Sequence, residues 1–175
     1  MLVIVGHGPS IVDRGLGPWL DEQTVVRLKW AERPNAADWG TRTDYVCASN
    51  PSFWMGRAAK GLPPLDAEFW FLPSRNDASK PGPGMRKGSA SWLDYWETFR
   101  TERAFPKPST GLKAIFCAVE FLKPDEIGLI GFDMVLHPES KTWKWYAPPG
   151  KYSYAHEAEA ERRCVMSLGV KITEL

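Results

Sequence analysis

Three small side chains, Ser109, Thr110 and Gly111, stand directly before an apolar, amphipathic segment at residues 112–122. This order predicts that a helix begins here. The first N–H groups of a helix have no partner within it, and about half a positive charge lies at that end. Hydroxyl groups and a glycine that permits close approach suit a bound phosphate or carboxylate. The same residues are also typical of a plain N-terminal cap made by Ser109, so both interpretations stand.

A second glycine-rich turn follows the apolar residues 1–5, which are Met-Leu-Val-Ile-Val. The turn consists of Gly6, His7, Gly8, Pro9 and Ser10. A strand, a glycine turn and a helix form the nucleotide-binding arrangement of open α/β folds. The third glycine of the dinucleotide fingerprint is missing, since residues 10–13 read Ser-Ile-Val-Asp. NAD binding is therefore not expected.

One histidine and two carboxylates are further candidates for chemistry. The imidazole of His156 has an unperturbed pKa of about 6.5 and can accept a proton near neutral pH. Taken alone, it is more typical of a histidine on a helix surface or in the core. Asp44 and Asp133 stand at the ends of expected strands, where carboxylates bind sugar hydroxyls or cap local turns. No Asp-x-Asp occurs in the sequence, which weighs against the metal-dependent nucleotide-sugar transferases.

The composition is that of one globular domain in a reducing compartment. The chain has 175 residues, 43% of them hydrophobic and 25% charged, which predicts a single domain over residues 1–175. No apolar run approaches the ~20 residues of a membrane span, and residues 1–5 are too short for a secretory signal. The three cysteines are widely spaced in apolar contexts, which indicates buried thiols. We therefore expect a cytoplasmic protein without membrane association.

Apolar runs alternate with amphipathic segments along the chain. Strands are expected at residues 1–5, 24–28, 44–47, 68–72, 125–133 (with a turn) and 170–172, and helices at 53–60, 91–103, 109–122 and 153–168. Residues 34–43 are expected to form a loop at the sheet edge. Strands separated by helices predict a Rossmann-like α/β domain with a mostly parallel sheet flanked by helices.

A mobile basic loop is expected at about residues 73–89. Its cations are Arg75, Lys80, Arg86 and Lys87. Long loops in compact domains are either solvated linkers or binding loops, and a basic one could hold a polyanion. Nine tryptophans supply core volume, and some could stack on a sugar or a base. The net charge of +1 argues against a strong overall field for nucleic acid.

Three segments in collinear order carry a family resemblance. The first motif is long and consists of the first glycine turn, Val-Val-Arg-Leu at residues 25–28, and residues 40–44. The second consists of residues 108–115 and 126–133, which end in Gly-Phe-Asp. The third is the pair His156 and Glu161. Together they cover about two thirds of the chain. In these motifs the chain resembles the sialyltransferase-like glycosyltransferases of family 29 and their bacterial and viral relatives.

The resemblance implies an inverting transfer of a sugar from a nucleotide-sugar donor to an acceptor hydroxyl, without metal or other cofactor. His156 would be the general base, and Glu161 would fix a helix start or orient a neighbour. The nucleotide-sugar site would comprise Gly6, His7, Gly8, Pro9, Ser10, Arg27, Lys29, Asp44, Ser109, Thr110, Gly111, Phe132 and Asp133. Here His7 and Lys29 stand where the family has asparagines.

The acceptor is open between two chemical classes. One is a glycan or small saccharide. The other is a hydroxymethylated pyrimidine in DNA, as modified by some bacteriophage glycosyltransferases, for which the basic loop would hold the phosphates. A third hypothesis is a non-catalytic nucleotide- or sugar-binding module, because His7 and Lys29 depart from the family and a fold does not establish a reaction.

Overall fold

The computed structural model describes residues 1–28, 35–48, 66–72, 84–99, 108–136 and 158–175. Its strands are β1 (Leu2–Val5), β2 (Thr24–Leu28), β3 (Tyr45–Cys47), β4 (Glu68–Phe71), β5 (Met85–Lys87), β6 (Glu126–Ile130) and β7 (Lys171–Glu174). Its helices are the 3-10 turn η1 (Pro9–Ile11), α1 (Gly17–Leu20), α2 (Ala36–Trp39), α4 (Ser91–Glu97), α5 (Thr110–Leu122), α6 (Asp133–Leu136) and α7 (Ala158–Met166).

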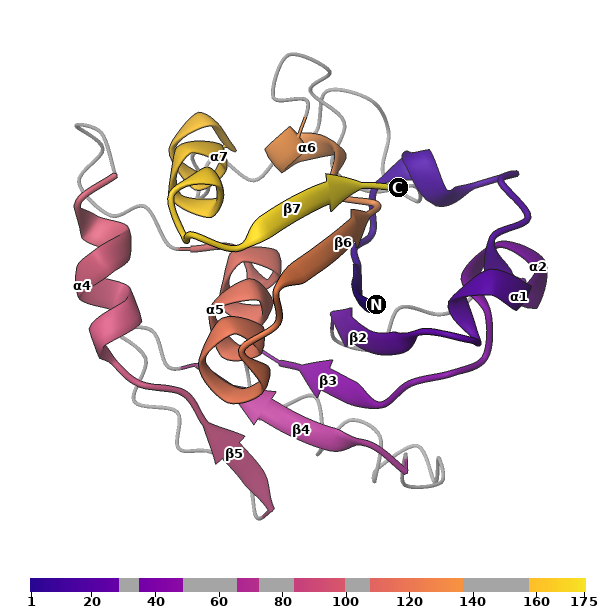
Figure 1. Ribbon diagram of the computed structural model, residues 1–175, viewed down its shortest axis with the longest axis horizontal. Helices are drawn as coiled ribbons and strands as arrows, with labels where there is room; N and C mark the ends of the chain where they lie inside the picture. Colours follow the sequence, from indigo (N-terminus) through magenta and orange to yellow (C-terminus); the bar gives the residue numbers. More distant parts are fainter. Residues whose placement is uncertain (29–34, 49–65, 73–83, 100–107, 137–157) are drawn as a thin grey trace.

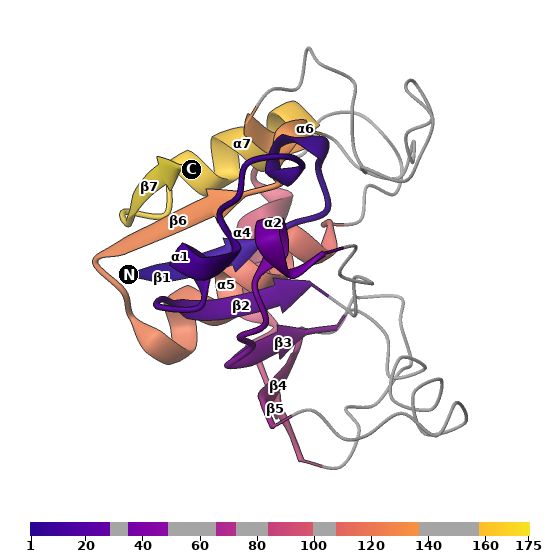
Figure 2. The ribbon, with the colours of Figure 1, turned by 90° about the vertical axis from the view of Figure 1, so that its right-hand side faces the viewer.

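All seven described strands form one sheet in the order β5-β4-β3-β2-β1-β6-β7, and every neighbouring pair is parallel. The expected parallel α/β architecture is confirmed. Figure 2 shows β1, β2 and β6 running in the same direction. Along the chain the strands proceed outward from β1 to β5 and then return to β6 on the other side of β1. The strand order therefore reverses between β1 and β6, where open α/β sheets bind ligands beyond the strands' carboxyl ends.

Helices cover both faces of this sheet (Figure 1). The larger core layer lies under α4, α5 and α7 and includes Ile4, Val26 and Leu129. The opposite layer joins Val3 and Val25 to residues of η1, α1 and α2. Because successive strand residues point to opposite faces and both faces are covered, the strands are nearly continuous apolar runs.

Helix α5 begins where its sequence predicts. The backbone of Ser109 is extended, with φ −63° and ψ 162°, and its hydroxyl accepts a hydrogen bond from Leu112 N. Lys123 ends the helix in the left-handed conformation, and Pro124 follows. Because only Lys123, Pro124 and Asp125 separate α5 from the amino end of β6, the start of α5 points toward the carboxyl edge of the sheet.

Several expected boundaries differ from those in the structure. The first glycine turn leads into the three-residue η1 rather than a full helix, because the backbone of Val12 is already extended. The expected loop at residues 34–43 contains α2, which Asn35 caps by accepting a hydrogen bond from Asp38 N. Both elements are single turns, too short for their apolar periodicity to stand out.

The expected basic loop at residues 73–89 is wrong at its carboxyl end, because residues 85–87 form the edge strand β5. Polar side chains are tolerated on an edge strand, so this segment lacks the apolar signature of the inner strands. Residues 73–83 lie outside the described part of the chain. The expected helix at 53–60 also lies outside it. Helices expected at 91–103 and 153–168 are described as the shorter α4 and α7.

Candidate functional site

The loops after β1 and β6 meet at the point where the strand order reverses. Gly6 N donates to Ile130 O at 2.7 Å, and Gly8 N donates to Gly131 O at 2.7 Å. A Cβ atom on Gly6 would overlap the carbonyl oxygen of Gly131. The two glycines therefore permit close packing of the loops, and their N–H groups bond within the protein rather than pointing at a ligand.

Phe132 links the first turn to the start of α5. A Cβ atom on Gly6 would lie 2.9 Å from Phe132 Cδ2, and one on Gly111 would lie 2.7 Å from Phe132 Cε1. The aromatic ring thus lies against both glycines, and no larger residue fits at either position without moving it. This ring brings together the two glycine-bearing turns that the sequence singles out.

Asp133 holds the first turn against the loop after β6. Its Oδ2 accepts a hydrogen bond from Ser10 Oγ at 2.9 Å, and its Oδ1 accepts from Ser10 N at 3.2 Å. A Cβ atom on Gly8 would overlap the same carboxylate. The carboxylate of Asp133 therefore bonds to a turn that lies 123 residues away in the chain, not to a turn of its own.

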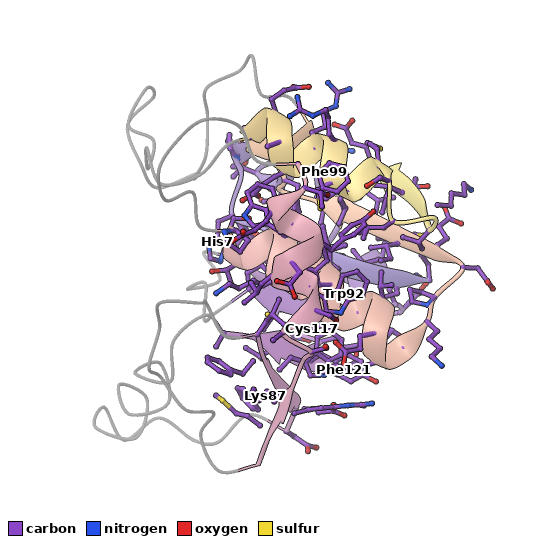
Figure 3. The ribbon with its side chains drawn as sticks, turned by 90° about the vertical axis from the view of Figure 1, so that its left-hand side faces the viewer. His7, Lys87, Trp92, Phe99, Cys117 and Phe121 are labelled. Atoms are coloured by element: carbon purple, nitrogen blue, oxygen red, sulfur yellow. The ribbon has the colours of Figure 1, made fainter. Side chains whose placement is uncertain are left out.

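His7 lies at the carboxyl edge of the sheet, between the ends of β1 and β2 (Figure 3). Its Nε2 is 3.0 Å from the carbonyl oxygen of Leu28, the last residue of β2. A carbonyl oxygen only accepts, so Nε2 carries the proton of this hydrogen bond. The ring is half-buried, and the bond fixes which nitrogen is protonated in the neutral form.

The start of α5 is bound to α7 through a buried carboxyl group. Glu161 is fully buried, and its Oε1 and Oε2 lie 2.6 Å from Ser109 N and Ser109 Oγ, respectively. Ser109 Oγ in turn accepts from Leu112 N at 3.1 Å. Ser109 is therefore a helix cap, as one sequence hypothesis states, and Glu161 orients it.

Burial raises the pKa of Glu161 to about 7, although the two hydrogen bonds from Ser109 favour the ionised form. This carboxyl group therefore exchanges its proton near neutral pH. The charge of Glu161 next to the start of α5 thus changes within the physiological pH range.

We expect Glu161 to make the stability of the protein depend on pH. Its unfolded pKa is near 4.5, so between pH 4.5 and 7 the unfolded chain loses a proton that the folded chain keeps. The free energy of unfolding should fall by about 3 kcal/mol across this interval and level off above pH 7. Urea denaturation of wild type and Glu161→Gln at pH 5 to 8 measures the difference. Equal pH slopes in the two proteins would contradict the expectation.

Two predicted site residues have side chains that bond to the connection between β2 and β3 instead of to these loops. Arg27 is 5% exposed, and its guanidinium donates to Trp39 O at 2.6 Å and to Arg42 O at 2.9 Å. Asp44 stands at the amino end of β3, where it accepts from Val25 N at 2.7 Å and pairs with Arg42 at 2.9 Å. Both side chains hold the connection between β2 and β3, and Asp44 lies at the opposite edge of the sheet.

The described cations of the expected basic loop also lie apart from His7. Arg86 pairs with Glu68 at 3.5 Å, and its guanidinium carbon lies 4.1 Å from the ring centroid of Phe121. Lys87 follows Arg86 on the edge strand β5, whereas His7 lies in the loop after the inner strand β1 (Figure 3). Four further predicted residues, Lys29, Arg75, Lys80 and His156, lie outside the described residues.

No protein-family model matches this sequence, and no curated protein matches it either. Among solved structures, a mammalian sialyltransferase in complex with Gal-β-1-3GalNAc-ortho-nitrophenol matches with a TM-score of 0.59 and 15% identity. The match covers 99% of this chain and 68% of that one. The fold is sialyltransferase-like. A second mammalian sialyltransferase structure gives a TM-score of 0.49 at 14% identity, with the same coverage of both chains.

Within this sialyltransferase-like fold, Lys113 is a buried charged residue that is not among the predicted site residues. It belongs to the first turns of α5 and is only 2% exposed. The available signal was the one lysine of a mostly apolar helix, four residues before the buried Cys117. Buried amines are rare in proteins, which makes Lys113 a further candidate for a functional role in the first turns of α5.

Other expectations about the core are confirmed. Trp39, Trp70 and Trp96 are buried, and Cys47, Cys117 and Cys164 are buried free thiols.

Across the described ranges, no helix is long and apolar enough to cross a membrane. Nor do those ranges contain a cluster of three His, Cys, Asp or Glu residues placed to hold a metal ion.

Proposed function

We propose that this protein is a glycosyltransferase that moves a sugar from a nucleotide-sugar donor to an acceptor hydroxyl. The observation that carries the proposal is the meeting of two glycine-bearing turns around Phe132, where the strand order reverses. The start of the long helix α5 belongs to the same place. Similarity to a sialyltransferase fold supports the reaction class.

The donor phosphate would bind at the start of α5, near Thr110 and Gly111. Positive charge of the helix dipole is concentrated there, and N–H groups of the first turn point out of the helix. Ser109 and Glu161 hold this end rigidly, which lowers the reorganisation needed on binding. His7 and Lys29, which differ from the family's asparagines, would adapt the site to its particular donor.

In the transfer itself, His156 would remove the proton of the acceptor hydroxyl as the acceptor oxygen attacks the anomeric carbon of the sugar. The bond from that carbon to the donor phosphate breaks in the same displacement, so the configuration inverts. The phosphate leaves with a negative charge, which the helix start stabilises. A glycan is the proposed acceptor, because the matched sialyltransferase was solved with a Gal-β-1-3GalNAc derivative.

Incubation with a panel of nucleotide sugars tests the proposal. Slow hydrolysis of one donor in the absence of an acceptor is expected, with faster turnover when a saccharide acceptor is added. Donor binding without any turnover would indicate a non-catalytic module. Transfer to hydroxymethylated DNA but not to saccharides would move the acceptor to the alternative class.

Chelation is expected to leave turnover unchanged. The sequence has no paired carboxylates of the Asp-x-Asp kind, and the helix start provides positive potential for the leaving phosphate without an ion. The measurement is the initial rate with and without EDTA, followed by addition of Mg²⁺ or Mn²⁺. A rate that disappears on chelation and returns with either ion would show that the proposed mechanism is wrong.

A further inference from the structure

The proposed phosphate site already has a carboxyl group of the protein beside it. Both oxygens of Glu161 accept hydrogen bonds from Ser109, whose hydroxyl thus donates to Glu161 Oε2. Ser109 directly precedes Thr110 and Gly111, the residues proposed to hold the donor phosphate. A phosphate at the start of α5 would consequently approach a fully buried carboxylate.

Two negative charges at one buried helix start repel each other strongly, because little water screens them. A single proton on Glu161 removes the conflict. It also changes the hydrogen bonds, because a protonated carboxyl group can donate to Ser109 Oγ instead of accepting from it. Ser109 Oγ, with two lone pairs, can accept from both Leu112 N and Glu161, and its own hydrogen then becomes available to another acceptor.

We propose that Glu161 takes up a proton from solvent when a phosphate ester binds at the start of α5, and that the Ser109 hydroxyl then turns from Glu161 to the phosphate. This inference rests on the proposed function and adds a proton to the binding equilibrium. Donor affinity therefore depends on pH through a residue that need not touch the donor.

Other ionisable groups surround this pair. On α7, burial raises the pKa of Cys164 to about 12, with Glu161 adding to the shift, so this thiol stays neutral. The helices that contact α7 carry Lys113 and Glu120 on α5 and Asp133 on α6. Helix α4, whose Tyr95 hydroxyl donates to Ser167 O just after α7, carries Asp94 and Glu97. His7 is the described site residue whose ordinary pKa also lies near neutrality, so it is the alternative source of proton uptake.

Isothermal titration calorimetry of the whole protein with the nucleotide sugar that binds best in the panel provides the test. Titrations at pH 7 in two buffers of different ionisation enthalpy give the number of protons taken up. About half a proton is expected at pH 7 for a group with a pKa of about 7. Affinity should fall about fivefold from pH 7 to pH 8, as the protonated fraction falls from one half to one eleventh.

Two variants assign the proton. The number of protons taken up per donor bound should fall to zero in Glu161→Gln, which keeps a neutral side chain of the same shape. In His7→Gln this number should stay at the wild-type value, whatever the donor affinity of that variant. In wild type, infrared difference spectra should show a new carboxylic acid band on binding, a result that does not depend on the folding of any variant. Donor binding without proton uptake would overturn the role of Glu161 but leave the proposed function standing. The same holds if the donor binds to His7→Gln without proton uptake. Absence of binding by every nucleotide sugar between pH 6 and 8 would instead overturn the proposed function, and the inference with it.

Discussion

His156→Ala is expected to lower turnover by about 10²–10⁴-fold, the usual effect of removing a general base. The acceptor hydroxyl would then attack without a group to take its proton. Donor affinity should stay close to that of wild type, because the base acts on the acceptor. Steady-state rates and calorimetric donor binding, measured on the same preparations, separate these two effects.

His137→Ala is the matched control for this variant. His137 is followed by Pro138, outside any expected helix, and is not part of the three collinear motifs. Its replacement should change turnover only slightly. An inactive His137→Ala protein beside a nearly normal His156→Ala protein would mean that the general base has been assigned to the wrong histidine.

Gly6→Ala is expected to destabilise the fold by more than about 3 kcal/mol, the upper range for overpacking a buried site. The added Cβ atom would overlap the carbonyl oxygen of Gly131, which is backbone and cannot rotate away. It would also press on Phe132 and separate the two loops of the candidate site. Urea denaturation followed by circular dichroism measures the change in free energy of unfolding.

Gly128→Ala is a suitable control on the neighbouring strand β6. There the added Cβ atom would lie 2.6 Å from Leu175 Cδ1, the end of a side chain that can rotate. The loss of stability should be clearly smaller than for Gly6→Ala. Equal losses for both variants would show that the close approach of Gly6 and Gly131 is not what constrains this position.

Local features of the sequence were sufficient for much of the architecture. Strand β2 agrees with its predicted residues 24–28, and α5 begins after the predicted cap at Ser109. An apolar run between polar turns and a serine before an apolar helix are both short-range signals. The edge strand β5 was missed because Arg86 and Lys87 reduce its apolar signature, and η1 is too short to differ from a loop.

The role of Asp44 illustrates what short-range signals could not provide. The sequence places it at a strand end, but its position before β3 puts it at the amino edge of the parallel sheet. Arg27 belongs to the first motif and lies next to Val5 of β1, yet its guanidinium bonds to backbone carbonyls of Trp39 and Arg42. Strand direction separates Asp44 from the candidate site, and the facing of the side chain separates the guanidinium of Arg27 from it.

By itself, the sequence determined the residue types, the capped helix start and the alternating elements of a parallel α/β domain. These depend on backbone preferences and burial patterns within a few turns of chain. Only the tertiary structure decided that Ser10 meets Asp133, that Ser109 meets Glu161 and that Phe132 lies between two glycines. The first two pairs are 123 and 52 residues apart in the chain. Contacts at such separations follow from strand order and helix packing, which no local preference encodes.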